Sequence, residues 1–207
     1  MKQALIIFAK NPIAGKVKTR LAATIGNENA LSVYRQLLLH TAEIASQLAV
    51  DKYVFYSDHI QQEDVWDNQL FSKETQRGND LGERMMQAFA SLFDNGYNRI
   101  VIIGTDCPEL STEIIIDAFQ LLEVYDFAIG PAHDGGYYLL GMKQFQASLF
   151  ENINWSTHTV LAETRVKCEA LQMDYTLLST LRDIDREEDL KYFKNQYHDQ
   201  HHHPDIQ

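Results

Sequence analysis

The sequence predicts a three-layer α/β/α domain built on a mostly parallel, twisted β-sheet. Two observations carry this prediction. Short apolar runs alternate with longer segments of helical period, and the runs are almost continuously hydrophobic, as in strands covered on both faces. Alternation of this kind joins parallel strands through right-handed crossovers. The length of 207 residues suits one domain, assigned to residues 1–197, followed by a His-rich polar tail over residues 198–207.

Five apolar runs are predicted to form the strands. They are Ala4–Ala9, Tyr53–Tyr56, Arg99–Gly104, Phe127–Gly130 and Tyr137–Met142. In parallel sheets ligands collect beyond the carboxyl ends of the strands. The loops after Ala9, Gly104 and Gly130 are therefore where a functional site is expected.

The segments between the strands have helical period. We expect helices over residues 29–49 and 80–95, one capped by Ser111 or Thr112, one from Thr157 to Leu171, and a short one near Asp185 that includes Leu190 and Phe193. Asp80 is a typical N-cap residue, and Gly96 is a typical stop signal.

Charge and composition narrow the function classes. A formal net charge of −11 argues against nucleic acid as a partner. Two cysteines, without metal-ligand spacing, favour a reduced cytoplasmic setting. No apolar stretch is long enough to cross a membrane. An uncovered apolar patch would support a homodimer.

A short basic segment follows the first predicted strand and leads into a helix. Helix N-termini and Lys or Arg side chains both bind phosphate. The alternative is a solvated basic turn, but the strand–loop–helix context favours anion binding. The segment lacks the P-loop pattern. The expected nucleotide- and phosphate-binding residues are Ala9, Lys10, Gly15, Lys16, Lys18, Thr19 and Arg20.

Asp106 stands directly after the strand that ends at Gly104. A hard carboxylate ligand at this position suits Mg²⁺, which takes one or two carboxylates plus substrate phosphates. The alternative is a capping or turn aspartate. Because Asp106 is expected at the same sheet edge as the basic segment, the metal interpretation is favoured.

The segment from Gly130 to Gly141 contains His-Asp-Gly-Gly-Tyr-Tyr. Asp134 is expected to act as a base toward an acceptor or to contact a phosphate. The residues after it, Gly135, Gly136 and Tyr137, are assigned to the acceptor side. The alternative is a plain Asp-Gly hairpin turn between two strands.

Two further polar segments carry weaker signals. Gln76 and Asp80 precede a helix and would contact a base or sugar, or else form a capped helix entrance. The acids of residues 182–190 are explained, on their own, by a charged helix start.

Several of these segments together resemble one protein family. FAKNPIAGKVKTRLA, QRGNDLGERM, IIGTDCPEL, GPAHDGGYYLLG, NWST and DIDREEDL occur in the order seen in the rSAM/selenodomain-associated transferase 1 family. That family is also described as a glycosyltransferase family linked to arsenosugar biosynthesis. The resemblance covers almost the whole chain and implies a GT-A-like nucleotide-diphospho-sugar transferase fold.

A more distant similarity links the chain to nucleotidyltransferases, including 2-phospholactate guanylyltransferases. It implies phosphate contacts from Lys10, Lys18 and Arg20 and metal ligation by Asp106, with Asp185 as a second metal ligand. The loop departs from that pattern in keeping one glycine and gaining Pro12. An Asp-x-Asp motif is also absent, because Pro108 replaces its second acid.

The sequence thus predicts a metal-dependent glycosyltransferase that uses Mg²⁺ or Mn²⁺, a nucleotide-diphosphate sugar donor and a small-molecule acceptor. Asp106 and Asp134 are its expected catalytic residues. The alternative enzyme is a nucleotidyltransferase that joins a nucleoside triphosphate to a phosphorylated acceptor and releases pyrophosphate. A nucleotide-binding accessory protein without catalysis is the third interpretation.

Overall fold

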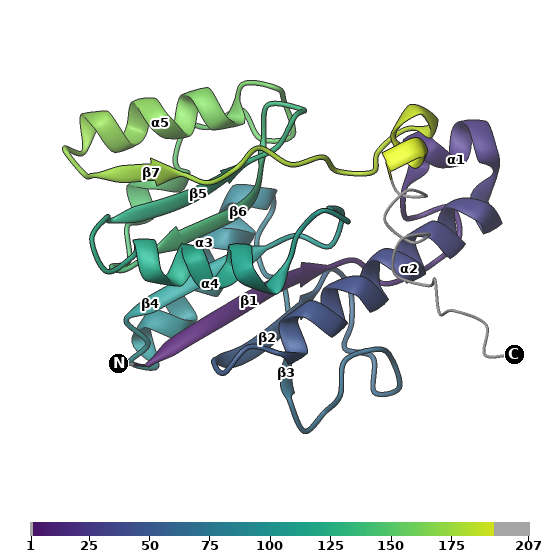
Figure 1. The fold of residues 1–207 in the computed structure, drawn as a ribbon, viewed down its shortest axis with the longest axis horizontal. Helices are drawn as coiled ribbons and strands as arrows, with labels where there is room; N and C mark the ends of the chain where they lie inside the picture. Colours follow the sequence, from purple (N-terminus) through teal and green to yellow (C-terminus); the bar gives the residue numbers. More distant parts are fainter. Residues whose placement is uncertain (1, 193–207) are drawn as a thin grey trace, which may run out of the picture.

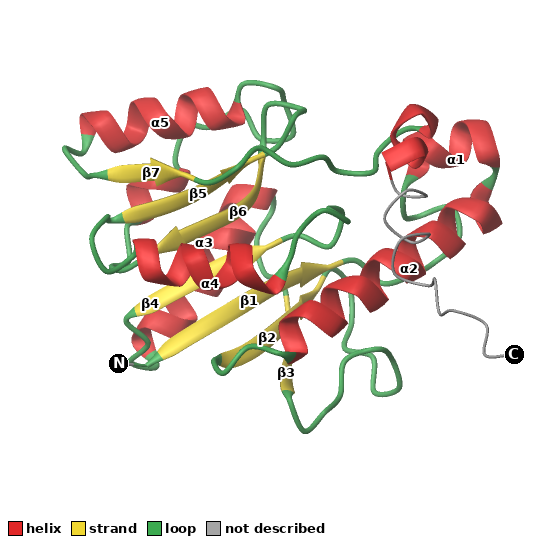
Figure 2. Ribbon diagram, viewed as in Figure 1, coloured by secondary structure: helices red, strands yellow, loops and turns green. Residues whose placement is uncertain are grey.

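The computed structural model describes residues 2–192 of the chain. Its centre is a seven-stranded sheet in the order β3-β2-β1-β4-β6-β5-β7 (Figures 1 and 2). The strands are β1 Gln3–Ala9, β2 Asp51–Tyr56, β3 Phe71–Thr75, β4 Arg99–Ile103, β5 Phe127–Pro131, β6 Tyr137–Met142 and β7 Tyr175–Leu177. The predicted α/β fold with a mostly parallel sheet is confirmed.

One described strand runs against the others. β6 pairs antiparallel with both β4 and β5, while the β1–β2, β1–β4, β2–β3 and β5–β7 pairs are parallel. The carboxyl ends of β1, β4 and β5 therefore lie at one edge of the sheet. This edge also receives the start of β6, so the loops predicted to carry the site meet there.

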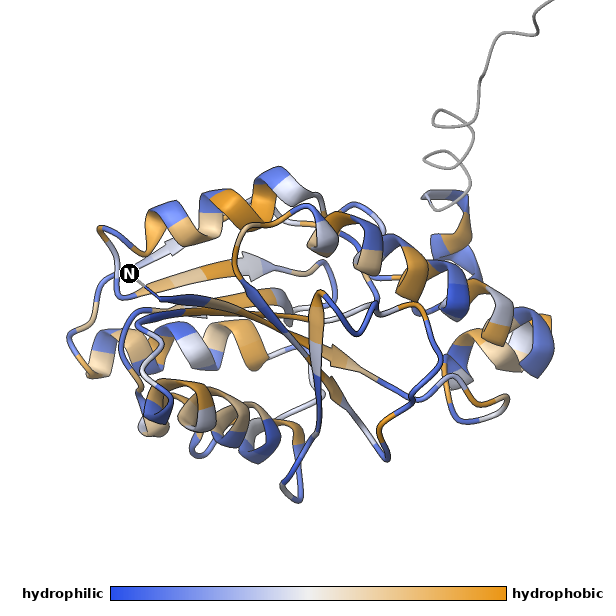
Figure 3. Ribbon diagram, turned by 90° about the horizontal axis from the view of Figure 1, so that it is seen from below, coloured by the Kyte–Doolittle hydropathy of each residue, from blue (hydrophilic) through white to orange (hydrophobic). Residues whose placement is uncertain are grey.

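Helices cover both faces of the sheet. The helices are α1 Thr19–Ile25, α2 Asn27–Ser46, α3 Leu81–Asp94, α4 Thr112–Leu121 and α5 Val160–Ala170, with short 3₁₀ helices η1 Ala147–Phe150 and η2 Glu187–Asp189. α2 and α4 pack on one face, and α3, α5 and η1 on the other. Each helix mixes hydrophobic and hydrophilic residues (Figure 3), as expected for elements that bury one side only.

The alternation of side chains along β1 explains why two cores form. Leu5 and Ile7 point toward α2 and α4, whereas Ala4 and Ile6 point toward α3, and all four are fully buried. A strand buried on both faces cannot keep polar positions. The continuous apolar run seen in the sequence is the direct result.

A third, smaller core lies beyond the carboxyl edge of the sheet. Leu21 from α1 packs with Ala30 and Leu37 from α2 and with Ile184 from the C-terminal segment. Figure 1 shows this segment crossing from β7 to lie beside α1. The first loop of the chain and its C-terminal segment are thereby brought together.

The sequence prediction missed some elements. β3 and β7 were not predicted, because FSKET alternates with polar residues and YTL is only three residues long. Helix α5 begins at Val160 rather than after Thr157, whose hydroxyl bonds to the Asn154 carbonyl instead of capping a helix.

Near the C-terminus, the described part of the predicted short helix includes η2. Phe193 and the His-rich tail over residues 198–207 lie outside the described residues. Within residues 2–192, no helix combines the length and hydrophobicity needed to cross a bilayer.

Candidate active site

Two adjoining cavities open at the carboxyl edge of the sheet. The first, of about 530 Å³, lies between the ends of β1 and β4 and the start of α3. The second, of about 880 Å³, lies between the basic loop, the turn before β6 and residues 155–160. Asp106, Asp183 and Tyr137 line both cavities, so the carboxylates stand where the cavities meet.

Lys18 is held at this junction. It has a left-handed backbone (φ 48°) at the start of α1, and its side chain is almost fully buried. The ammonium group lies 2.8 Å from the Asp106 carboxylate and also donates to the Ile184 carbonyl. A buried lysine with these two acceptors is a fixed positive charge. The prediction that Lys18 and Asp106 share one sheet edge is met by direct contact.

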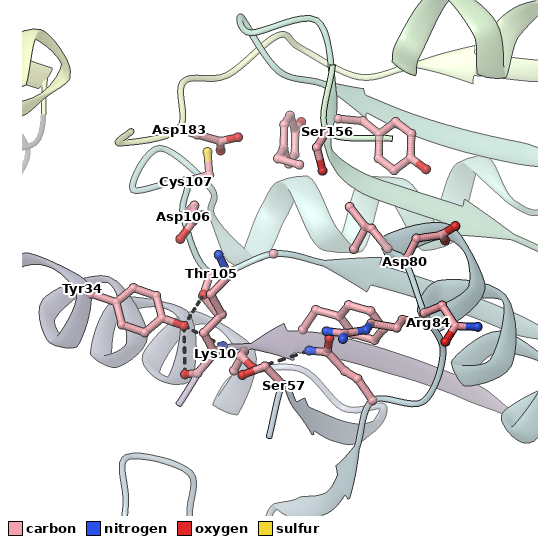
Figure 4. A pocket seen from close by; sticks show the side chains of 18 residues that line it. Lys10, Tyr34, Ser57, Asp80, Arg84, Thr105, Asp106, Cys107, Ser156 and Asp183 are labelled. Atoms are coloured by element: carbon pink, nitrogen blue, oxygen red, sulfur yellow. Dashed lines mark hydrogen bonds between the residues drawn. The ribbon is translucent and has the colours of Figure 1, made fainter. Parts of the chain in front are cut away.

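The C-terminal segment adds Asp183, which the sequence analysis did not single out. The Ile184 N–H donates to the Asp106 carbonyl (2.9 Å), and the Arg182 N–H donates to the Glu109 carboxylate (2.6 Å). These bonds fix Asp183 near Asp106 in the first cavity (Figure 4). Burial, with added repulsion from Asp106, raises the pKa of Asp183 to about 7, although Lys18 opposes the shift.

Asp185, the predicted second metal ligand, pairs with Arg20 at 2.9 Å. Both side chains are substantially exposed. Asp183, by contrast, lines both cavities together with Asp106, and repulsion from Asp106 helps to raise its pKa. The spacing of DIDREEDL could not distinguish the two aspartates, because their difference depends on which backbone groups the segment bonds to.

Asp106 and Asp183 are the carboxylates at the junction that could hold a divalent cation. Two carboxylates that repel each other are stabilised by a hard cation, and Mg²⁺ commonly takes one or two carboxylates together with substrate phosphates. Among the described residues no cluster of three or more acidic, His or Cys side chains surrounds a single point. A cation held here would therefore need oxygen ligands from the substrate or water.

Asp134 lies in the turn between β5 and β6. Its carboxylate accepts a hydrogen bond from the Gly136 N–H (2.8 Å), and it also lines the second cavity. The antiparallel β5–β6 pair means that the hairpin alternative describes the local structure correctly. The turn nevertheless presents Asp134, Gly136 and Tyr137 to the cavity.

The first cavity contains the other predicted nucleotide residues. The Gln76 amide donates to the Phe55 carbonyl (2.9 Å), and Asp80 caps α3 through the Glu83 N–H (2.8 Å). Both residues line the cavity together with Ala9 and Lys10. Asp80 thus serves as a helix cap and also faces the cavity, which the sequence treated as alternatives.

Lys10 is positioned by Tyr34, whose role the sequence analysis missed. The buried Tyr34 hydroxyl accepts from the Lys10 N–H (2.8 Å), donates to the Lys10 carbonyl and lies 3.3 Å from the Thr105 hydroxyl (Figure 4). Burial raises its pKa well above the ordinary value, so the phenol stays neutral. The signal in the sequence was a hydroxyl among the mostly apolar buried residues of α2.

The remaining predicted residues divide between the second cavity and other places. Lys16, Thr19 and Arg20 line the second cavity. Gly15 (φ 77°) and Gly135 (φ 90°) line neither of the two cavities, and both occupy turns that need a positive φ.

Cys107 is buried in the first cavity wall, and burial raises its pKa strongly, so its thiol is inert there.

Comparison with protein families gives one match. Residues 40–157 match the model of the DUF2064 family, described as an uncharacterized protein conserved in bacteria. The chain belongs to this family. No curated protein matches the sequence.

A solved structure from Desulfovibrio desulfuricans G20, provisionally named as a nucleotide-diphospho-sugar transferase, is similar over almost the whole length. It has 32% identity and a TM-score of 0.86, and the match covers 95% of this chain and 89% of that one. The match supports the predicted class of enzyme, a transferase, for this DUF2064 member.

More distant structures share the fold. One is CMP:2-keto-3-deoxy-manno-octonic acid synthetase complexed with CTP, at 9% identity and a TM-score of 0.59, with 97% of this chain and 100% of that one covered. Another is the inositol-1-phosphate CTP transferase from T. maritima, at 14% identity and a TM-score of 0.58, with 98% and 97% covered. At these identities the likeness establishes the fold alone.

Proposed function

We propose that this protein is a metal-dependent glycosyltransferase that moves a sugar from a nucleotide-diphosphate donor to a small-molecule acceptor. The observation that carries the proposal is the junction of the two cavities. A buried ammonium, from Lys18, and two carboxylates, from Asp106 and Asp183, stand between a nucleotide-sized space and a larger open space. The provisional name of the similar structure from Desulfovibrio desulfuricans G20 points the same way.

In this proposal the donor diphosphate lies over the junction. Lys10 and Lys18 would bind its oxygens as point charges, and Arg20 would grip two of them with its planar fork. Mg²⁺ or Mn²⁺, held by Asp106 with Asp183, would neutralise the charge that develops on the leaving diphosphate. We propose Asp183 in this role in preference to Asp185, because Asp183 lines both cavities together with Asp106, whereas Asp185 lines the second but not the first.

The nucleoside would occupy the first cavity and the acceptor the second. Gln76 and Asp80 offer an amide and a carboxylate for base or ribose contacts. Asp134 would accept the acceptor proton or orient the acceptor hydroxyl from the second cavity. Positioning two reactants across one diphosphate removes much of the entropic cost of their encounter.

Nucleotidyl transfer remains the second candidate because of one observation. Four basic side chains, from Lys10, Lys16, Lys18 and Arg20, line the second cavity, where Lys18 and Arg20 are paired with carboxylates. A triphosphate and a phosphorylated acceptor would use all four. The same cavities would then hold the nucleoside triphosphate and the acceptor.

A ligand panel tests the proposal. Nucleoside diphosphates, nucleoside triphosphates and nucleotide sugars are each added with and without Mg²⁺ or Mn²⁺, and the unfolding midpoint is measured. A ligand at about 100 times its dissociation constant stabilises the native state by about 2.7 kcal/mol. Metal-dependent stabilisation by nucleotide sugars supports glycosyl transfer. Preference for a triphosphate, with acceptor-dependent pyrophosphate release, supports nucleotidyl transfer. If no ligand raises the unfolding midpoint, glycosyl transfer and nucleotidyl transfer are both contradicted.

A further inference from the structure

Residues 154–159, which follow η1 and precede α5, form a loop closed by one carboxylate. Glu163 of α5 accepts from the Asn154 N–H (2.7 Å), from the Asn154 side-chain amide (2.8 Å) and from the Thr159 hydroxyl (2.7 Å). The Thr157 hydroxyl donates to the Asn154 carbonyl across the loop (2.7 Å). This bonding fixes the shape of the loop in advance of any ligand.

The same loop is pressed against two neighbouring elements. A Cβ atom on Gly82 would lie 2.1 Å from the Trp155 indole nitrogen, and one on Gly135 would lie 2.1 Å from the His158 carbonyl oxygen. Gly82 is in the first turn of α3, and Gly135 is in the turn before β6. The loop therefore touches both elements that border the cavities, and glycine is what allows each close approach.

The loop presents neutral groups to the second cavity. Trp155 stacks on Phe150 (ring centroids 6.4 Å apart), its indole nitrogen lies against Gly82, and the side chain is only partly buried and lines the cavity. Ser156, Thr157 and His158 are exposed and line the same cavity. The loop sequence NWSTHT contains no Lys, Arg, Asp or Glu, whereas the facing basic loop supplies Lys16, Lys18 and Arg20.

We infer that residues 154–159 bind a hydroxyl-bearing ring attached to the distal phosphate of the nucleotide, with Trp155 as its stacking surface and Glu163 as a positioning residue. An amphipathic aromatic ring beside neutral hydrogen-bonding groups suits a ring that is apolar on its face and polar at its edge. The phosphates are accounted for by the opposite, basic wall. In glycosyl transfer this ring is the donor sugar, and in nucleotidyl transfer it belongs to the product.

This inference rests on the proposed nucleotide site. Binding measurements distinguish failure of the inference from failure of the proposed function. The probes are UDP-glucose, GDP-mannose, ADP-glucose and dTDP-glucose, each compared with its own nucleoside diphosphate by calorimetry. For the preferred base, the sugar is expected to tighten binding about tenfold. Trp155→Ala is expected to remove that gain and leave diphosphate affinity unchanged, while Trp155→Phe keeps part of it.

Tryptophan fluorescence emission is a second measurement of nucleotide-sugar binding at Trp155. The chain has two tryptophans, and Trp66 is buried in the core on the α2 face of the sheet, at 2% exposure. Emission changes on ligand binding should therefore come from Trp155. We expect the nucleotide sugar to change the emission and its diphosphate to leave it almost unchanged.

Glu163→Gln tests the positioning role. It is expected to lose the sugar-dependent gain and keep the diphosphate affinity, because only the loop shape changes. Glu169→Gln is the matched control, since Glu169 is exposed on the same helix and contacts Tyr175 rather than the loop. Equal affinity for sugar and diphosphate in the unmodified protein overturns the inference and leaves the proposed function standing. Failure of every probe to bind overturns both.

Discussion

The two walls of the second cavity are held together by different interactions. The charged wall depends on contacts between residues far apart in the chain, such as Arg20 with Asp185 and Lys18 with the Ile184 carbonyl. The neutral wall, residues 154–159, is closed by bonds from Asn154 and Thr159 to nearby Glu163. The contacts of the charged wall can form only when the whole fold is in place, whereas the hydrogen bonds that close the neutral wall join residues near one another in the sequence.

The two walls should also respond oppositely to pH. The pKa of Asp183 is raised, whereas hydrogen bonds, chiefly from Asn154, lower the pKa of Glu163. Changes in the charged wall should therefore affect chemistry and pH dependence most. Changes in the neutral wall should affect stability and ligand choice. The following predictions test this division.

The largest effect is expected from Asp106→Asn. The change removes the partner of Lys18 and a carboxylate that lines both cavities, so metal-dependent turnover should fall by about a thousandfold. Asp117→Asn is the control, because Asp117 is exposed on α4. Turnover that stays within about threefold of the unmodified protein contradicts an electrostatic role for this wall.

The next largest effect is expected on stability, from Gly135→Ala. Its backbone needs a positive φ, and the added methyl group would meet the His158 carbonyl, so we expect a loss of about 2–4 kcal/mol. Gly96→Ala shares the positive φ but meets no atom within 4 Å, and should cost about 1 kcal/mol. Urea unfolding measures both, and equal losses would show that the loop does not press on Gly135.

Asp183→Asn should change how stability depends on pH. Because the native state keeps the Asp183 proton up to about pH 7 while the unfolded chain loses it near the ordinary pKa of 3.8, stability falls as pH rises between these values. The asparagine variant should lose this slope and gain on the order of 2 kcal/mol above pH 7, after allowance for partial exposure. Unfolding curves from pH 4 to 8 measure it.

Glu163→Gln, in the neutral wall, should change the pH dependence of stability in the opposite direction. A lowered native pKa contributes stability above the ordinary glutamate value of 4.5, which is lost as pH falls through the native pKa. The variant should therefore lose stability near neutral pH and approach the unmodified protein at low pH. The same pH slope in both variants would mean that the two walls do not differ.

The smallest effect is expected from Arg20→Gln. The Arg20–Asp185 pair is largely exposed, so its loss should leave the unfolding midpoint unchanged within error. Nucleotide affinity should fall a few-fold, and raising the salt concentration should narrow that difference. An affinity loss that is independent of salt would indicate a shape role for Arg20.

Much of the fold was predictable because β1, β4, β5 and β6 are buried on both faces and must be apolar. The proximity of Lys18 and Asp106 at one sheet edge was predictable because each follows such a strand. Asp183 and Tyr34 were not, since their placement depends on packing between distant segments. Thr157 is a typical N-cap residue and predicts a helix start, but its hydroxyl bonds to the Asn154 carbonyl, and the Thr159 hydroxyl bonds to Glu163.

The late position of Ile184 in the sequence has a consequence during synthesis. Lys18 and Asp106 leave the ribosome well before the segment that supplies the Ile184 carbonyl and the Asp183 carboxylate. The nascent chain can form β1 to β4 and still lack a finished site, since domains fold as the N-terminal part emerges first. The junction of the two cavities therefore lacks one of its two carboxylates until residues 183–184 have been synthesised.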